Sequence, residues 1–150
     1  MIRRAAPADE ADIRRCAEEA YAGYVAAIGR RPAPMVADFA AEIAAGEVHV
    51  ALAEDGGLCG YIVFRPEAEH MLLENVAVFP AVAGQGVGGA LIRFCEAEAR
   101  RRGLSAVRLY TNEKMTDNLR IYPRLGYAEI ARRHEDGFAR VFFEKRMPPG

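Results

Sequence analysis

The chain lacks a long apolar stretch, and its charges nearly cancel. No run in its 150 residues approaches the roughly 18 apolar residues that a membrane helix needs, which argues against a membrane-spanning protein. Residues 1–5 lack the apolar segment of a signal peptide, so we expect a cytoplasmic protein. With 20 basic and 21 acidic residues, the formal net charge is −1, and we expect neither nucleic acid nor a membrane as a partner.

Cysteine and histidine are also scarce. The three cysteines, Cys16, Cys59 and Cys95, are widely spaced and fit neither a disulfide framework nor a zinc site, so we expect reduced thiols. The three histidines show no metal-ligand spacing, so no metal is expected. Internal repeats and linkers are absent as well. The whole chain, residues 1–150, is therefore predicted to form a single domain.

Apolar periodicity and turn signals predict the order of elements. A short strand at 2–5 precedes a helix that Gly23 ends or weakens, and a second short helix follows. Hairpin and turn signals then join three antiparallel strands. A helix at 86–102 crosses over to a strand that must be parallel to the third one. The remaining expected elements are a helix containing Pro123, which should kink it or delay its start, a closing hairpin near 127–145, and a tail at 148–150.

A glycine-rich stretch follows the third strand of this meander. Pro80 ends the strand, and four glycines lie between Gly84 and Gly89, directly before the amphipathic helix. The first turn of a helix has unpaired N–H groups and the positive end of the helix dipole, which together bind anions, most often phosphate. A flexible turn with several glycines is the alternative. Neither a P-loop, which requires Gly-Lys-Ser/Thr, nor a dinucleotide-binding Gly-x-Gly-x-x-Gly opening the sheet is present.

Two motifs in this order resemble those of the GNAT superfamily of acyl-CoA-dependent N-acetyltransferases. Ala83-Gly84-Gln85-Gly86-Val87-Gly88 is similar to the family's pyrophosphate signature, Arg/Gln-x-x-Gly-x-Gly/Ala, and departs from it at Ala83. Residues 118–127 resemble the family's Tyr-x-x-x-Gly-Phe/Tyr element, with Tyr122 as its tyrosine. The family's asparagine lies seven residues before that tyrosine, where this chain has Met115, whereas Asn118 lies four before it.

The resemblance covers nearly the whole chain and implies a fold, a co-substrate and a set of binding residues. The implied fold is α+β, with a mixed, mostly antiparallel sheet of six or seven strands, about four helices, and one parallel βαβ crossover at the CoA site. The implied co-substrate is acetyl-CoA. The residues expected to bind it are Val76, Ala77, Val78, Gly84, Gln85, Gly86, Val87, Gly88, Gly89, Asn118 and Tyr122.

The implied reaction is direct attack of a primary amine on the thioester. Glu74, on a mostly apolar strand, is the candidate base, and the alternatives are that it faces solvent or pairs with a cation on a neighbouring strand. The resemblance places an oxyanion-binding backbone N–H near Val76. Tyr122 is the candidate acid, and a packed aromatic is the alternative.

The resemblance implies an acceptor groove between the first helices and the last hairpin. The residues it implies there are Tyr21, Tyr24, Arg30, Arg31, Met35 and the turn at 134–136. The acceptor is a small-molecule or peptide amine, with polyamine, amino acid, aminoglycoside and peptide N-terminus all open. A homodimer is possible. A non-catalytic acyl-CoA-binding or regulatory domain is the alternative function, because a fold alone does not determine activity.

Overall fold

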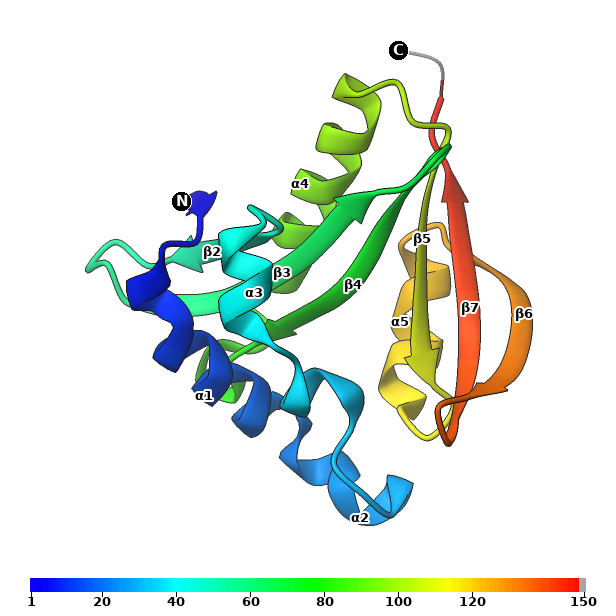
Figure 1. The fold of residues 1–150 in the computed structure, drawn as a ribbon, viewed down its shortest axis with the longest axis horizontal. Coiled ribbons are helices and arrows are strands. Elements are labelled where there is room, and N and C mark those ends of the chain that lie inside the picture. Colours follow the sequence, from blue (N-terminus) through cyan, green and yellow to red (C-terminus); the bar gives the residue numbers. More distant parts are fainter. Residues whose placement is uncertain (149–150) are drawn as a thin grey trace. The chain divides into compact units, whose positions relative to one another are not determined.

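The structure is a computed structural model that describes residues 1–148 (Figure 1). Most of the expected tail at 148–150 lies outside the described residues. Seven strands form one sheet in the order β1-β2-β3-β4-β5-β7-β6. They are β1 (Ile2–Arg4), β2 (Val48–Leu52), β3 (Leu58–Pro66), β4 (His70–Val78), β5 (Ala106–Asn112), β6 (Ala128–Glu135) and β7 (Phe138–Arg146).

Helices join the strands as the apolar patterns predicted. They are α1 (Glu10–Tyr21), α2 (Val25–Ile28), α3 (Phe39–Ala44), α4 (Val87–Arg101) and α5 (Thr116–Arg124), with 3₁₀ turns at Pro7–Asp9, Ala22–Tyr24, Ala33–Val36 and Pro80–Val82. Strands β4 and β5 are parallel, while β1–β2, β2–β3, β5–β7 and β6–β7 are antiparallel. The predicted mixed, mostly antiparallel fold with one parallel crossover is confirmed.

The chain packs as two compact units. One contains Met1–Phe64 and Asn75–Phe94, and the other contains Arg65–Glu74 and the chain from Cys95 onward. The boundaries fall within β3, β4 and α4, so these elements contribute to both units. A single domain over the whole chain stays a prediction.

In the first unit, the helical segment after β1 is interrupted where glycine predicted a weakness. A 3₁₀ turn spans Ala22–Tyr24, around Gly23, and α2 ends at Gly29 with a φ of 89°. Helix α3 begins at an N-cap, where the Asp38 side chain accepts a hydrogen bond from Ala41 N at 3.1 Å. The fully buried residues of this unit include Ile13, Phe39, Val48, Val50, Tyr61, Ile62, Val63 and Leu91.

In the second unit, a tight hairpin joins β6 and β7. Its two turn residues, Asp136 and Gly137, have φ values of 53° and 79°, as a type I′ turn requires. Helix α5 lies beside this hairpin (Figure 1). The helix starts at Thr116 and ends at Arg124, so Pro123 lies inside its last turn, where the ring removes one backbone hydrogen bond and crowds the carbonyl of residue 119. The late start considered from sequence was therefore wrong.

One buried ionic group also fixes the second unit. Glu96 on α4 is 5% exposed; its carboxylate accepts a hydrogen bond from the Tyr127 hydroxyl at 2.8 Å and pairs with Lys145 Nζ at 3.1 Å. Because both a hydroxyl and an ammonium satisfy this carboxylate, its burial is tolerated. This contact ties α4 to β7 and to the residue that precedes β6.

Among residues 1–148, no helix combines the length and the apolar character that a membrane span needs.

Candidate active site

The glycine loop leads directly into α4. Gly84 and Gly86 have φ values of 83° and 84°, and no atom lies within 4 Å of a Cβ built at either position. Backbone conformation, and not crowding within the chain, therefore requires glycine at both positions. Their exposed, side-chain-free surface also leaves room for a ligand to approach the backbone.

The start of α4 supplies donors beside these glycines. Ala90 N donates to Gly86 O at 3.0 Å, which closes the first turn of the helix. The N–H groups of Val87, Gly88 and Gly89 precede that bond and so have no acceptor within the helix. A Cβ at Gly88 would lie 3.5 Å from the Val78 side chain, so the helix start packs closely on the end of β4. The arrangement fits an anion such as a pyrophosphate.

Ala83 precedes the loop, where the family signature has Arg or Gln. The backbone of Ala83 is extended, with φ −61° and ψ 146°, and the residue is exposed to solvent. The methyl side chain cannot donate a hydrogen bond, so residue 83 offers a ligand no side-chain donor.

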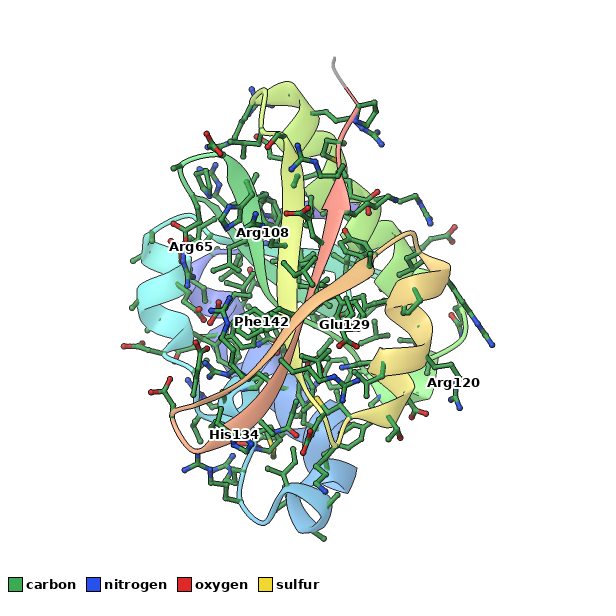
Figure 2. The ribbon with its side chains drawn as sticks, turned by 90° about the vertical axis from the view of Figure 1, so that its right-hand side faces the viewer. Arg65, Arg108, Arg120, Glu129, His134 and Phe142 are labelled. Carbon is green, nitrogen blue, oxygen red and sulfur yellow. The ribbon has the colours of Figure 1, made fainter. Side chains whose placement is uncertain are left out.

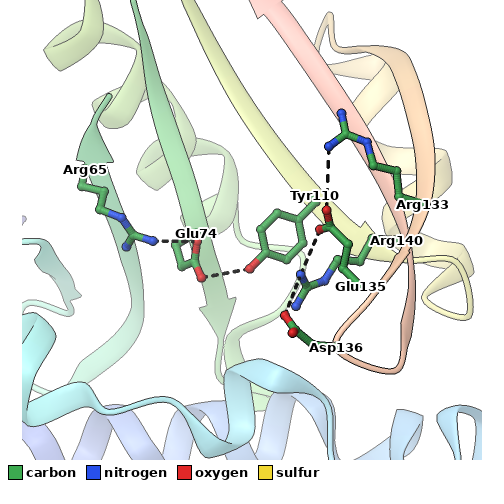
Figure 3. Close-up of polar contacts among 7 residues, drawn as sticks. All are labelled: Arg65, Glu74, Tyr110, Arg133, Glu135, Asp136 and Arg140. Atoms are coloured by element: carbon green, nitrogen blue, oxygen red, sulfur yellow. Dashed lines mark hydrogen bonds and ion pairs between the residues drawn. The ribbon is translucent and has the colours of Figure 1, made fainter. Parts of the chain in front are cut away.

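Glu74 lies at the point where the parallel pairing of β4 and β5 ends. The paired residues run from His70–Ala106 to Leu73–Leu109, and Glu74 is the next residue on β4. Its Oε2 lies 3.3 Å from Arg65 Nη2 on β3, and its Oε1 accepts a hydrogen bond of 2.9 Å from the Tyr110 hydroxyl (Figure 3). The pairing with a cation on a neighbouring strand, left open from sequence, is therefore present, and the carboxylate also has a second partner.

Tyr110 keeps its proton in this arrangement. Burial, and then the charge of Glu74, raise the pKa of Tyr110 to about 12. A protonated hydroxyl can donate only to the carboxylate oxygen, so the direction of the bond is determined.

Arg140 links Tyr110 to the last hairpin. Its guanidinium carbon lies 4.4 Å from the centre of the Tyr110 ring, and its Nη1 lies 3.2 Å from Glu135 and 3.5 Å from Asp136 (Figure 3). Arg133 pairs with Glu135 as well, at 3.7 Å. The acidic turn that the sequence offered as a contact for an acceptor amine thus pairs with arginines of its own hairpin.

Tyr122 is packed into the second unit. It is 7% exposed, and its ring lies 5.9 Å from that of Tyr127 and 5.8 Å from that of Phe143. Burial raises the pKa of Tyr122 to about 12, so the hydroxyl stays protonated at neutral pH and can act as a donor. The packed aromatic and the proton donor are both compatible with this position.

Other residues expected near the cofactor lie on or near α5. The Asn118 amide donates to Thr111 Oγ1 on β5 at 3.0 Å, and the thioether of the buried Met115 lies 3.6 Å from that amide. Arg120 pairs with Asp117 at 2.7 Å and projects outward from the helix (Figure 2). Asn118 therefore ties the start of α5 to the end of β5, and Arg120 has the exposed position expected of a solvated side chain.

Three of the residues expected to line the acceptor groove make contacts within the first unit. Arg31 pairs with Glu18 at 3.3 Å, and Met35 is buried. The Tyr21 hydroxyl, at the end of α1, is bonded to β4 at Asn75 and Val76.

The sequence did not single out Tyr110, Arg65 or Arg140, although the structure places them around Glu74 and its partner. Tyr110 follows Leu109 as Glu74 follows Leu73, so a correct β4–β5 register would have indicated the contact. That register depends on the long crossover through α4 that joins Val78 to Ala106, which local patterns do not determine.

Three free cysteines, two of them buried, agree with the expectation of thiols. Among residues 1–148, no group of three or more His, Cys, Asp or Glu side chains is arranged to hold a metal ion.

Comparison with known proteins gives one family. The sequence model of the Acetyltransferase (GNAT) family matches residues 12–127. The aminoalkylphosphonate N-acetyltransferase of Salmonella typhimurium is 37% identical over 57 residues, covering 38% of this chain. The match spans 37% of that relative's own length.

Solved structures share the fold over nearly the full chain. The PaiA N-acetyltransferase of Thermoplasma acidophilum, in complex with coenzyme A, is 19% identical with a TM-score of 0.79, over 97% of this chain and 98% of that one. The ribosomal-protein-S18-alanine N-acetyltransferase of Escherichia coli is 18% identical with a TM-score of 0.78, and the match covers 100% of this chain and 95% of that one. These comparisons confirm the predicted fold.

Proposed function

Because the chain belongs to the acetyltransferase (GNAT) family, we propose that it is an N-acetyltransferase that transfers the acetyl group of acetyl-CoA to a primary amine of a small molecule or peptide. The observation that carries this proposal is the glycine loop that opens α4 at the end of β4, where Gly84 and Gly86 adopt left-handed φ values and main-chain donors are clustered. In the related PaiA structure, the bound molecule is coenzyme A.

The residues of the loop fit this co-substrate. Main-chain N–H groups of Val87, Gly88 and Gly89, with the helix dipole, would hold the pyrophosphate. The other residues proposed to contact acetyl-CoA are Val76, Ala77, Val78, Gly84, Gln85, Gly86, Asn118 and Tyr122.

Bound acetyl-CoA supplies a thioester, whose carbonyl carbon bonds to the amine nitrogen as the carbon–sulfur bond breaks and CoA leaves as a thiol. A primary amine with a pKa near 10 is mostly protonated at pH 7, and reaching its neutral form costs about 4 kcal/mol. Glu74 would accept a proton from the amine, directly or through water. Arg65 and Tyr110 hold the two oxygens of that carboxylate in one orientation.

Two further residues would act on the charge that develops at the thioester. The Val76 N–H would donate a hydrogen bond to the carbonyl oxygen as it becomes negative. The protonated Tyr122 hydroxyl would then donate its proton to the sulfur.

The acceptor is proposed only as a class. The printed name of the Salmonella relative makes an aminoalkylphosphonate the first compound to test. Polyamines, amino acids, aminoglycosides and peptides with a free N-terminus complete the panel.

A thiol-release assay with acetyl-CoA and each amine tests the function, with calorimetric titration of acetyl-CoA beside it. Thiol release that depends on both substrates supports the enzyme. Tight binding without turnover on any amine would favour the non-catalytic acyl-CoA-binding domain, and absence of binding would remove the role of the glycine loop.

The three free cysteines suit the reducing cytoplasm, and sedimentation distinguishes a monomer from a homodimer.

A further inference from the structure

Asn75 is a polar residue on the buried face of β4. It is 6% exposed. The other buried residues on the same face of the strand are Met71, Leu73 and Ala77. A buried amide without hydrogen-bond partners would destabilise the fold. Both ends of this amide are satisfied, because Nδ2 donates to the Tyr61 hydroxyl at 2.8 Å and Oδ1 accepts from the Tyr21 hydroxyl at 3.1 Å.

The Tyr21 hydroxyl also reaches the main chain of β4. It lies 3.0 Å from the carbonyl oxygen of Val76, so its one hydrogen serves two acceptors. Tyr21 is the last residue of α1 and is 9% exposed. The end of α1 therefore holds both a side chain and a peptide group of β4 at this point.

The direction of the Val76 peptide follows from strand geometry. The N–H and C=O of one residue point to the same edge of a strand, and successive residues alternate. Phe79 N donates to Cys59 O on β3 at 2.9 Å, so residue 79 faces β3. Val76, three residues earlier, faces the opposite edge. The Tyr21 hydroxyl thus lies at the same edge as the N–H of Val76.

We propose that Tyr21 is a positioning residue for acetyl transfer, which holds the N–H of Val76 in the direction that the developing oxyanion needs. The inference rests on the proposed function, in which that N–H contacts the thioester oxygen. The two bonds of Tyr21 bracket the 75–76 peptide group, with the Asn75 side chain on one side and the Val76 carbonyl on the other. A donor stabilises a developing charge well only if it is already aimed at it, so restraining this peptide group contributes to the rate.

Kinetics of Tyr21→Phe give the first test. The substitution keeps the ring and removes both bonds, and we expect kcat to fall about 10-fold while the KM for acetyl-CoA and the Kd for CoA change less than about twofold. Tyr61→Phe is the matched control, because it removes a buried hydroxyl bonded to the same Asn75 and leaves the Tyr21–Val76 bond. We expect it to lower stability and keep kcat within about twofold of wild type. Full kcat in Tyr21→Phe, or an equal loss in Tyr61→Phe, would overturn the proposal.

A second measurement does not depend on turnover. In ¹⁵N relaxation of the protein alone, we expect the order parameter of the Val76 amide to be about 0.85 in wild type and in Tyr61→Phe, and to fall toward about 0.6 in Tyr21→Phe. The amides of β2 should not change. An unchanged Val76 order parameter in Tyr21→Phe would refute the positioning role even if kcat falls. A wild-type protein that acetylates no amine would refute the proposed function, and the order parameter would still decide whether Tyr21 restrains this peptide.

Discussion

The hydroxyl of Tyr110 donates a 2.9 Å hydrogen bond to Oε1 of Glu74, one residue beyond the last pair of the parallel β4–β5 ladder. The other carboxylate oxygen is held by Arg65, and Arg140 lies against the Tyr110 ring. Strands β3 and β5 thus hold the carboxylate proposed as the base in one orientation, and the last hairpin packs against the ring of Tyr110. A base must be within hydrogen-bond reach of the proton it takes, so this orientation bears directly on the reaction.

Glu74→Gln should lower kcat by about 100-fold, because an amide of the same shape cannot accept the proton of the amine. Acetyl-CoA affinity, measured by calorimetry, should stay within about twofold. Tyr110→Phe keeps the carboxylate and removes one restraint on it, so we expect a smaller loss of about 3- to 10-fold. Wild-type kcat in Glu74→Gln would show that another group, or water, takes the proton.

Tyr122→Phe should lower kcat by about 100-fold, because the ring stays packed while the proton donor is lost. Since the pKa of Tyr122 is raised to about 12, its hydroxyl is protonated throughout the neutral range, and its deprotonation should not reduce kcat below about pH 10. A pH–rate profile from about pH 6 to 10 checks this. Unchanged turnover in Tyr122→Phe would leave this residue only its packing role.

Gly86→Ala should destabilise the fold by about 1 kcal/mol, because φ is 84° at this position, and should also weaken acetyl-CoA binding by about 10-fold. Gly56→Ala is its matched control. Gly56 has a φ of 88° and equally open surroundings in the β2–β3 turn, so its replacement should cost similar stability and leave binding unchanged. Denaturant unfolding and calorimetric titration of both variants separate strain from ligand contact, and equal affinities in the two variants would contradict the assignment of the loop.

Glu98 should make stability depend on pH in the acid range. Hydrogen bonds from Arg101, and then from Arg102, lower the pKa of Glu98 to about 2. A carboxylate with a lowered folded-state pKa stabilises the fold above its unfolded value near 4.3, and this contribution disappears as the pH falls from about 4 to 2. These ion pairs of Glu98 lie at the surface, so their contribution to the free energy of unfolding is at most about 1 kcal/mol. The free energy of unfolding of Glu98→Gln should fall less steeply than that of wild type over this interval, and parallel curves would contradict the assignment.

Short-range sequence patterns were sufficient to predict the helices and strands and the anion site at the glycine loop. Alternating β-formers predicted β2, β3 and β4, Asp136-Gly137 predicted the tight turn of the last hairpin, and the four glycines after Pro80 predicted a backbone site at a helix start. Each of these depends on a few neighbouring residues, because backbone conformation and strand parity are set over short distances. The glycine loop and the motif at residues 118–127, taken together, were sufficient to predict the family.

Tertiary structure alone decided which side chains meet. Glu74 could have faced solvent or paired with a cation, and only the positions of β3 and β5 beside β4 brought Arg65 and Tyr110 to its two oxygens. Tyr21 was expected as a groove residue, and its hydroxyl is bonded to β4 at Asn75 and Val76. These contacts join residues 9 to 55 positions apart. A hydrogen bond forms only over about 3 Å, so it depends on register and packing, which no local pattern specifies.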